Sequence, residues 1–365
     1  MIVIHCTETL QGGVATYLNE ILRLKDKQIK YWVVAPLDQA KFLTSTPDRL
    51  ITYVSSRRRV ISAVRLAYTV NRITDRDLEG DSLVLHVHSS FAGLGVRIFS
   101  SMPSSKIIYC PHGWAFDQKV SVAKKALYRW VERYLSRRCG YILCISMHEH
   151  REAQRIGIAQ NKLILIRNGI GDLDGTANVD EAANVLYSDS SSPPNKRKEI
   201  VFAGRIDAQK GVEILKALPA LLPEDRFIYI GSPVLGQEVL EWPQNVSYLG
   251  WMPTHVVRSY MRRADIVIVP SLWEGFGLVA VEAMQQRTAV FASNVGALKE
   301  IIVDGVTGRL IADYESADAF ATAIKVTEKH MLKKMGNAGY QRQKEHFTAE
   351  QLVAELETLY KSLKT

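Results

Sequence analysis

The sequence contains little cysteine and no long hydrophobic run. Its 365 residues include four cysteines, Cys6, Cys110, Cys139 and Cys144, and no two of them have the C-x-x-C spacing of a zinc site. So few cysteines, mostly in apolar segments, are typical of reduced thiols in a cytosolic protein, so disulfides are not expected. No stretch of about 18 consecutive apolar residues occurs, and the first residues do not have the pattern of a signal peptide. We therefore expect a cytoplasmic protein without a membrane span of its own.

Charge is unevenly distributed along the chain. Hydrophobic residues make up 47% and charged residues 23% of the sequence, ordinary values that exclude a disordered or fibrous chain. The net charge is +8, but residues 1–170 contain 25 Lys and Arg against 13 Asp and Glu, which is +12. The remaining residues contain 21 against 25, which is −4. This asymmetry indicates an anionic partner for the first half, either nucleic acid or acidic lipid.

Short β-rich segments alternate with helical ones, the pattern of a parallel sheet built from βαβ units. The predicted strands are residues 2–6, 31–35, 51–54, 83–87, 106–110, 141–145 and 163–166 in the first half, and 200–203, 227–230, 246–249, 266–269, 289–292 and 309–311 in the second. The alternation fails over a polar, Ser- and Pro-rich segment between the two halves, which indicates a linker.

We therefore predict an α/β protein with two Rossmann-like, doubly wound parallel-sheet domains. The predicted domains are residues 1–172 and 199–345, joined by a linker at 173–198, and a C-terminal helix at 346–365 packs back across them. In such sheets, ligands bind beyond the carboxyl ends of the strands.

Gly12 and Gly13 follow the first predicted strand. Paired glycines let the backbone approach a ligand closely, and the start of the next helix, which runs to about Leu24, offers free N–H groups to an anion. The spacing is not G-x-G-x-x-G and no acidic residue ends the next strand, so a dinucleotide redox fold is disfavoured. A plain strand-to-helix turn is the alternative.

Charged residues also follow two strands of the second half. Arg205 ends the first of these strands and Lys210 comes about one turn later, an arrangement suited to a diphosphate because a charge-assisted hydrogen bond contributes about 1.5–3 kcal/mol. Glu274 follows another strand in a glycine-flanked turn, and Glu282 lies in the next helix. The first carboxylate can meet a sugar and the second the hydroxyls of a ribose, with the helix start between them facing phosphate. Two solvated glutamates are the alternative.

Together these motifs resemble family-four retaining glycosyltransferases of GT-B fold, of the bacterial polysaccharide-assembly type, whose two domains face a central cleft. The likeness covers almost the whole chain and is strongest over residues 200–310, which also contain Gly-Ala-Leu-Lys-Glu at 296–300 and Asp-Gly-Val-Thr-Gly at 304–308. The first domain matches through Gly12-Gly13, Pro111-His112-Gly113, Ser146 and Asn168-Gly169. One departure is Gly171, where such proteins often carry Asp.

The resemblance implies a role for each candidate residue. Glu274 and His112 would be catalytic and would contact the donor sugar beside the reacting carbon. The implied contacts of the donor diphosphate are Arg205, Lys210, Gly13, Gly277 and Leu278. The implied ribose contact is Glu282, the further sugar contacts are Gly275 and Phe276, and the base would rest near Gly250 and Trp251.

The resemblance also implies the reaction, in which a hexose passes from a UDP- or GDP-sugar to a saccharide acceptor, lipid-linked or soluble, in cell-surface polysaccharide synthesis. The departing phosphate oxygen would accept the acceptor's proton, so neither a metal nor a cofactor is expected. Asp172-Leu173-Asp174 mimics a metal-binding motif but falls at the edge of the linker. His86 and His88 share one strand face, yet we expect no third partner near them and predict a structural pair.

Two further patterns concern helices. Ser146 and Glu149 have the spacing of a capping box, so a structural role is expected for both. Basic amphipathic helices are predicted at 57–73 and 120–138, with one cationic and one apolar face each. Such helices bind anionic lipid at about 1 kcal/mol per basic residue, which predicts peripheral attachment to the inner face of the membrane. A core-facing helix with solvated cations is the alternative.

Two other functions are compatible with parts of the pattern. A nucleotide-sugar epimerase would keep the same fold but need no acceptor. A nucleic-acid-binding module would use the basic first domain, although no RNA- or DNA-reading motif accompanies the charge, so we expect no nucleic-acid partner.

Overall fold

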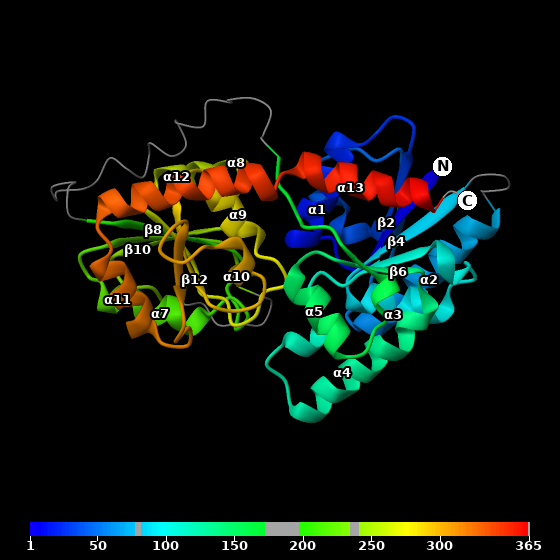
Figure 1. The fold of residues 1–365 in the computed structure, drawn as a ribbon, viewed down its shortest axis with the longest axis horizontal. Coiled ribbons are helices and arrows are strands. Elements are labelled where there is room, and N and C mark those ends of the chain that lie inside the picture. Colours follow the sequence, from blue (N-terminus) through cyan, green and yellow to red (C-terminus); the bar gives the residue numbers. More distant parts are fainter. Residues whose placement is uncertain (77–81, 172–196, 234–240, 364–365) are drawn as a thin grey trace. The chain divides into compact units, whose positions relative to one another are not determined.

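The computed structural model describes residues 1–76, 82–171, 197–233 and 241–363 and forms two compact units (Figure 1). Unit 1 consists of Met1–Gly171 together with Thr348–Thr365, and unit 2 of Asp172–Phe347. The predicted linker lies outside the described residues up to residue 196, as does the Asp-Leu-Asp motif.

Unit 1 contains a parallel sheet with the strand order β3-β2-β1-β4-β5-β6-β7. The strands are β1 (Ile2–Thr7), β2 (Lys30–Pro36), β3 (Arg49–Tyr53), β4 (Leu83–His88), β5 (Ile107–Cys110), β6 (Tyr141–Cys144) and β7 (Leu163–Leu165). The order reverses direction between β1 and β4, so the carboxyl ends of these two strands form the topological switch point, where sheets of this kind bind ligands.

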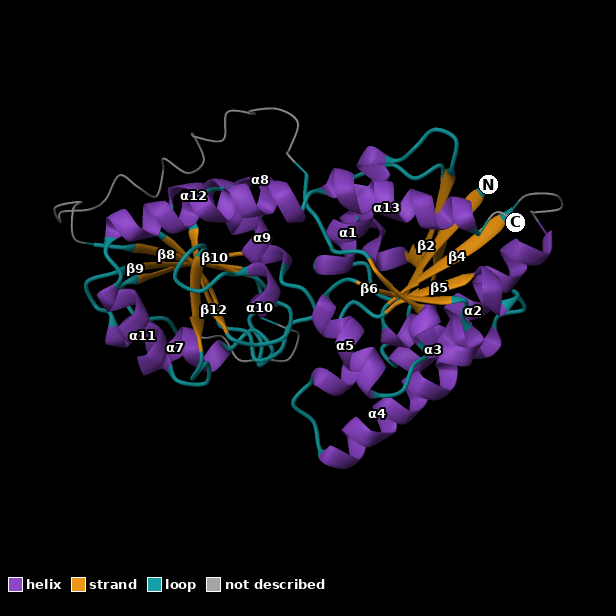
Figure 2. Cartoon of the chain, viewed as in Figure 1, coloured by secondary structure: helices purple, strands orange, loops and turns teal. Residues whose placement is uncertain are grey.

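Helices cover both faces of this sheet, with α1 and α13 on one side and α2 and α3 on the other (Figure 2). The helices are α1 (Gly13–Leu24), α2 (Arg59–Arg76), α3 (Ser90–Phe99), α4 (Val122–Leu135), α5 (Met147–Arg155) and α13 (Ala349–Ser362). Short 3₁₀ segments occur at Leu37–Phe42, Ser104–Lys106, Ala115–Asp117, Ser136–Arg138 and Gln160–Lys162.

The two faces of the sheet differ in chemistry. Residues such as Ile4, Leu85 and Val87 belong to an apolar core that includes residues of α2 and α3. The alternate residues His5, His86 and His88 point to the other face, because side chains alternate along a strand. That face therefore buries polar rings beneath α1 and α13.

Unit 2 repeats the architecture with the strand order β10-β9-β8-β11-β12-β13, so its switch point lies between β8 and β11. Its strands are β8 (Glu199–Ala203), β9 (Arg226–Ile230), β10 (Val246–Gly250), β11 (Ile266–Val269), β12 (Ala289–Ser293) and β13 (Gly308–Ile311). Its helices are α7 (Val212–Leu221), α8 (Thr254–Arg263), α9 (Leu278–Gln285), α10 (Leu298–Ile301), α11 (Ala317–Val326) and α12 (Lys329–His346).

The predicted strands are all confirmed, each within two residues of its expected bounds. The predicted C-terminal helix is α13, which begins with a capping box made by Thr348 and Gln351 and packs against α1 in unit 1. The four cysteines are free and buried, as expected. Among the described residues, no helix is both long enough and apolar enough to cross a membrane.

Candidate active site

The ends of β8 and β11 bring Lys210 and Glu274 together at the switch point of unit 2. Lys210 Nζ lies 2.6 Å from Glu274 Oε2, and the two side chains are only 18% and 11% exposed. The turn after β8 is closed by Asp207, whose Oδ1 accepts the Lys210 N–H at 3.0 Å. Gly211 ends this turn with φ 74°, and a Cβ there would lie 2.1 Å from the carbonyl oxygen of Pro270. Close backbone packing therefore fixes the position of the charged pair.

Arg205 belongs to the same turn. Its guanidinium Nη2 lies 2.7 Å from Gln209 Oε1 and 3.2 Å from Asp207 Oδ2. The Gln209 amide in turn donates to the main-chain oxygen of Trp273 at 3.3 Å, next to Glu274. The Arg205 side chain is 57% exposed, so this cation is accessible while Lys210 is held inside.

The Glu274 turn rests on the predicted Gly-Ala-Leu-Lys-Glu motif. A Cβ on Gly296 would lie 2.1 Å from the carbonyl oxygen of Glu274, and the Ala297 N–H approaches that oxygen at 3.4 Å. The turn ends at Gly277, which has φ 106° and precedes α9, whose first residue is Leu278. Within the described chain no side chain caps α9, and its first turn contains no acidic residue. Its N–H groups are therefore suited to an anion.

Glu282 lies further along α9 and faces α8. Its Oε1 is 3.9 Å from Nη2 of Arg258, and both side chains are largely buried. Sequence reasoning missed Arg258, because a cation inside an amphipathic helix gives no signal of the carboxylate it meets.

Glycines form the carboxyl ends of β8, β9 and β10. The Gly231 N–H donates to the carbonyl of Gly250 at 2.7 Å, and a Cβ on Gly231 would lie 1.8 Å from the oxygen of Gly204. Gly250 has φ 67° with open space around it, and the following Trp251 is 64% exposed. This edge therefore presents mainly backbone. Gly231 was not among the predicted site residues, although its position as a glycine at the end of a strand could have indicated it.

The predicted sugar contacts Gly275 and Phe276 lie in the turn before α9. The Phe276 side chain is buried, and its ring packs on Phe347 with centroids 5.8 Å apart. Its ring is therefore part of the core, and the main chain of this turn is what remains to meet a sugar.

In unit 1, α1 begins at Gly13 much as α9 begins at Leu278. Gly12 precedes it with φ 57°, and both glycines are exposed. Over the described residues, no side chain caps α1 and no acidic residue lies in its first turn. Both helix starts thus lack a side-chain cap and follow a glycine with positive φ, but the backbone differs, since ψ is −133° at Gly12 and 53° at Gly277.

Gly171, the departure from the family pattern, lies against the side chain of Arg23. A Cβ there would lie 1.7 Å from Nη2 of Arg23, whose guanidinium pairs with Glu20 at 2.9 Å. A side chain at this position would require the Arg23 guanidinium to move.

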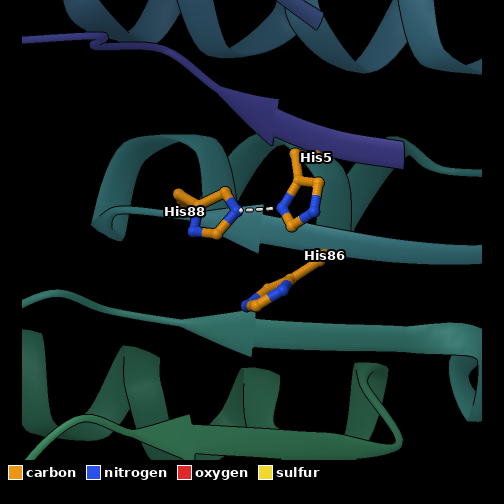
Figure 3. A group of neighbouring side chains, drawn as sticks. All are labelled: His5, His86 and His88. Carbon is orange, nitrogen blue, oxygen red and sulfur yellow. Dashed lines mark hydrogen bonds between the residues drawn. The ribbon is translucent and has the colours of Figure 1, made fainter. Parts of the chain in front are cut away.

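His112 follows β5 with φ 54°, an uncommon backbone conformation for a residue with a side chain. Its Nε2 lies 2.9 Å from Nδ1 of His88. Nε2 of His88 in turn lies 2.9 Å from Nδ1 of His5, the hydrogen bond drawn in Figure 3. The expectation that His86 and His88 lack a third partner is wrong, because the parallel pairing of β1 with β4 places His5 beside His86. Burial lowers the pKa of His5 and His112 to about 3 and the pKa values of His86 and His88 well below the usual value.

Two groups of these side chains lie close enough together to be metal ligands. One nitrogen from each of His5, His86 and His88 lies within 4.8 Å of the others, as do ligand atoms of His88, Cys110 and His112. However, ring-to-ring hydrogen bonds already use both nitrogens of His88, and His86 Nδ1 lies 2.6 Å from the hydroxyl of Tyr360. The distances between these ring nitrogens are those of hydrogen bonds.

Glu149 holds the loop that carries His112. The predicted capping box is half formed: the Ser146 hydroxyl accepts the Glu149 N–H at 3.1 Å. The Glu149 carboxyl instead accepts the N–H groups of Gly113 and Ile145, and burial raises its pKa to about 8. This role was missed because the Ser-x-x-Glu spacing already had a capping explanation.

Comparison with known proteins identifies the family. The pattern of Glycosyltransferase Family 4 matches residues 11–172, and that of Glycosyl transferases group 1 matches residues 186–342. A 41.2 kDa protein from the cps region of Klebsiella pneumoniae is 31% identical over 341 residues, covering 91% of this chain and 90% of that protein. The Escherichia coli UDP-Gal:alpha-D-GlcNAc-diphosphoundecaprenol alpha-1,3-galactosyltransferase is 25% identical over 68% of this chain and 67% of its own length.

A solved structure supports the fold. The Anabaena protein HepE in complex with UDP-glucose superposes with a TM-score of 0.76 at 17% identity, over 99% of this chain and all of that one. At this identity the likeness concerns the fold alone. The chain belongs to the family 4, group 1 glycosyltransferases and has their GT-B fold of two Rossmann-like parallel-sheet domains.

Proposed function

We propose that this chain transfers a hexose from a UDP- or GDP-sugar to a lipid-linked saccharide, with retention of the anomeric configuration, in cell-surface polysaccharide synthesis. The observation that carries the proposal is the Lys210–Glu274 pair at the switch point of unit 2, beside the uncapped start of α9. It combines positive groups for a diphosphate with a carboxylate for the attached sugar. The UDP-dependent name of the E. coli relative and the UDP-glucose in HepE favour this donor class.

The proposed mechanism follows from where charge develops. Cleavage of the bond between the anomeric carbon and the phosphate oxygen makes that carbon positive and the leaving diphosphate negative. Arg205, Lys210 and the N–H groups at Gly277 and Leu278 would stabilise the diphosphate, so no metal is needed for that purpose. Glu274 would hold a sugar hydroxyl and oppose the positive charge of the ring. The acceptor oxygen bonds to the anomeric carbon on the face that the diphosphate leaves, and its proton passes to the departing phosphate oxygen.

The remaining roles complete this proposal. Glu282 would bind the ribose hydroxyls, and the backbone near Gly250 would support the base. In unit 1 we assign a phosphate contact to Gly13 and a sugar contact to His112.

The test is a panel of UDP- and GDP-sugars, first for thermal stabilisation and then for nucleotide release with lipid-extract acceptors. We expect release that depends on the acceptor, persists in EDTA and gives a product with the donor's anomeric configuration by NMR. A changed sugar without an acceptor would indicate the epimerase. A salt-dependent oligonucleotide shift without nucleotide-sugar binding would indicate the nucleic-acid-binding module.

We also propose that α2 and α4 attach the protein to an anionic membrane surface. On α4 the apolar side chains of Leu127, Trp130 and Tyr134 are 54%, 62% and 54% exposed, whereas Leu135 is buried, so only part of the predicted apolar face is turned to the core. They stand beside Lys125, Arg129 and Arg133, which recur at helical spacing. On α2, Val60, Val64 and Tyr68 are exposed as well, whereas Ala67 and Ile73 are buried. Exposed apolar and basic groups on one helix favour a lipid surface.

Vesicle sedimentation tests this attachment. We expect binding to phosphatidylglycerol vesicles that weakens with salt, little binding to phosphatidylcholine, and clear loss in Trp130→Ser. Val326→Ser, which removes another exposed apolar side chain from α11, is the matched control. Equally weak binding to both lipids would contradict the proposal.

A further inference from the structure

Three imidazoles run in series from the surface of unit 1 into its interior. His112 is partly exposed, whereas His88 and His5 have no exposed surface. Each of the two hydrogen bonds, both 2.9 Å long, joins Nε2 of one ring to Nδ1 of the next ring inward. The inner bond is drawn in Figure 3. His88 therefore uses both of its ring nitrogens within the series.

The surroundings keep these rings neutral. Burial is the main cause that lowers the pKa of His5 and His112 to about 3 and that of His88 well below its usual value. The neighbouring groups that ionise are His86, Tyr17, Tyr31, Tyr360, Cys110 and Glu149. Burial raises the pKa of Tyr17, Tyr31, Tyr360 and Cys110, so they are uncharged too. The Glu149 carboxyl is engaged by the N–H groups of Gly113 and Ile145.

Neutrality fixes the order of the protons. A neutral imidazole has one N–H and one lone pair, so His88 must donate on one side and accept on the other. Both protons of the series therefore point the same way, either outward or inward. At the inner end, His5 Nε2 is buried without a hydrogen-bond partner among the described residues. The inward order would leave a buried N–H there, whereas the outward order leaves only a lone pair, and orphaned buried N–H groups are the rarer kind.

The outward order determines what His112 presents. His5 donates to His88, His88 donates to Nε2 of His112, and the proton of His112 then lies on Nδ1. The backbone helps to hold this ring, because φ at His112 is 54° and Glu149 binds the next N–H. A strained conformation of this kind persists where the surrounding structure enforces it.

We propose that His88 and His5 are positioning residues that hold His112 as a neutral ring with its proton on Nδ1, so that it donates a hydrogen bond to an oxygen of the donor sugar. This inference rests on the sugar contact proposed above for His112. The order of protons, however, can be measured without any reaction.

The test begins with NMR of protein labelled with ¹⁵N-histidine, which shows which ring nitrogen carries the proton. We expect His112 to have Nδ1–H and not to titrate between about pH 5 and 8. An Nε2–H form, titration near the ordinary histidine pKa or a bound stoichiometric metal ion would each overturn the proposal. These measurements on the wild-type protein test the position of the His112 proton even if every variant fails to fold.

Two variants of His88 test its contact with His112 and its contact with His5 one at a time. His88→Asn places an amide near the position of Nδ1, toward His112, whereas His88→Gln places one near Nε2, toward His5. We expect His88→Asn to keep the single form of His112 and His88→Gln to give a mixture. With the donor found active in the panel, kcat/KM should fall about tenfold in His88→Gln, mainly through KM, and recover in His88→Asn.

Identical spectra and kinetics in two folded variants would refute a positioning role. If no nucleotide sugar is active, the proposed function fails while the NMR result still stands. The exposed His330→Gln is the control for labelling and folding.

Discussion

The charged pair in unit 2 leads to a prediction about Glu274→Gln in which affinity and turnover change in opposite directions. Lys210 donates to Glu274 at 2.6 Å, so a bound diphosphate must share this lysine with the carboxylate. A charge-assisted hydrogen bond contributes about 1.5–3 kcal/mol, and the neutral amide of Gln competes less strongly for the ammonium. We expect affinity for UDP or GDP to stay the same or rise by up to about tenfold, or about 1.4 kcal/mol. Turnover should fall by about 100-fold or more, because the sugar loses its carboxylate, a loss of about 2.7 kcal/mol.

Titration calorimetry with UDP and GDP measures the first quantity, and nucleotide release at saturating donor measures the second. Glu328→Gln is the matched control, since Glu328 is 77% exposed and pairs with His330. The control should change neither quantity. The reasoning fails if Glu274→Gln keeps full turnover, or if it binds the nucleotide more than about tenfold more weakly than the unsubstituted protein.

Three further predictions use the same protein. Arg205→Ala should weaken UDP binding by about tenfold or more in calorimetry, because it removes an exposed charge-assisted contact, and an unchanged affinity would remove Arg205 from the site. Gly231→Ala should lower the free energy of unfolding in urea well beyond Gly305→Ala, since a Cβ at Gly231 would lie 1.8 Å from a carbonyl oxygen, whereas Gly305 has positive φ in open space and should cost about 1 kcal/mol. Equal losses would contradict this. Burial lowers the pKa of His5 to about 3. Below the ordinary histidine pKa, the unfolded chain therefore binds a proton at His5 that the folded chain does not bind, and the free energy of unfolding decreases as pH falls. Between pH 7 and 5 the loss is about 2 kcal/mol, so His5→Phe should flatten the pH dependence of the free energy of unfolding by that amount.

The strands and their ends could be predicted because their signals are local. A buried parallel strand is a short apolar run between polar turns, and the runs at β1 and β8 are of this kind. The meeting of Lys210 with Glu274 also followed from topology, since each residue comes after a strand that borders the switch point.

Other features depend on contacts that no local pattern contains. His5 joins His86 and His88 only through the register of two strands about 80 residues apart in the chain. Arg258 meets Glu282 through the packing of two helices, and Phe347 covers the ring of Phe276 from beyond the end of α12. In each case the partner is chosen by tertiary packing rather than by spacing along the sequence.

Because α13 belongs to unit 1, this unit cannot be completed until the residues after unit 2 have been translated. The first sheet is translated before unit 2, but Tyr360, whose hydroxyl meets His86, is translated only after unit 2. Unit 2 is continuous in sequence, so all of it is available for folding before unit 1 is complete, whereas domains usually fold in order from the N-terminus. In a nascent chain that ends before Thr348, α13 does not yet cover the face of the first sheet that carries the histidines.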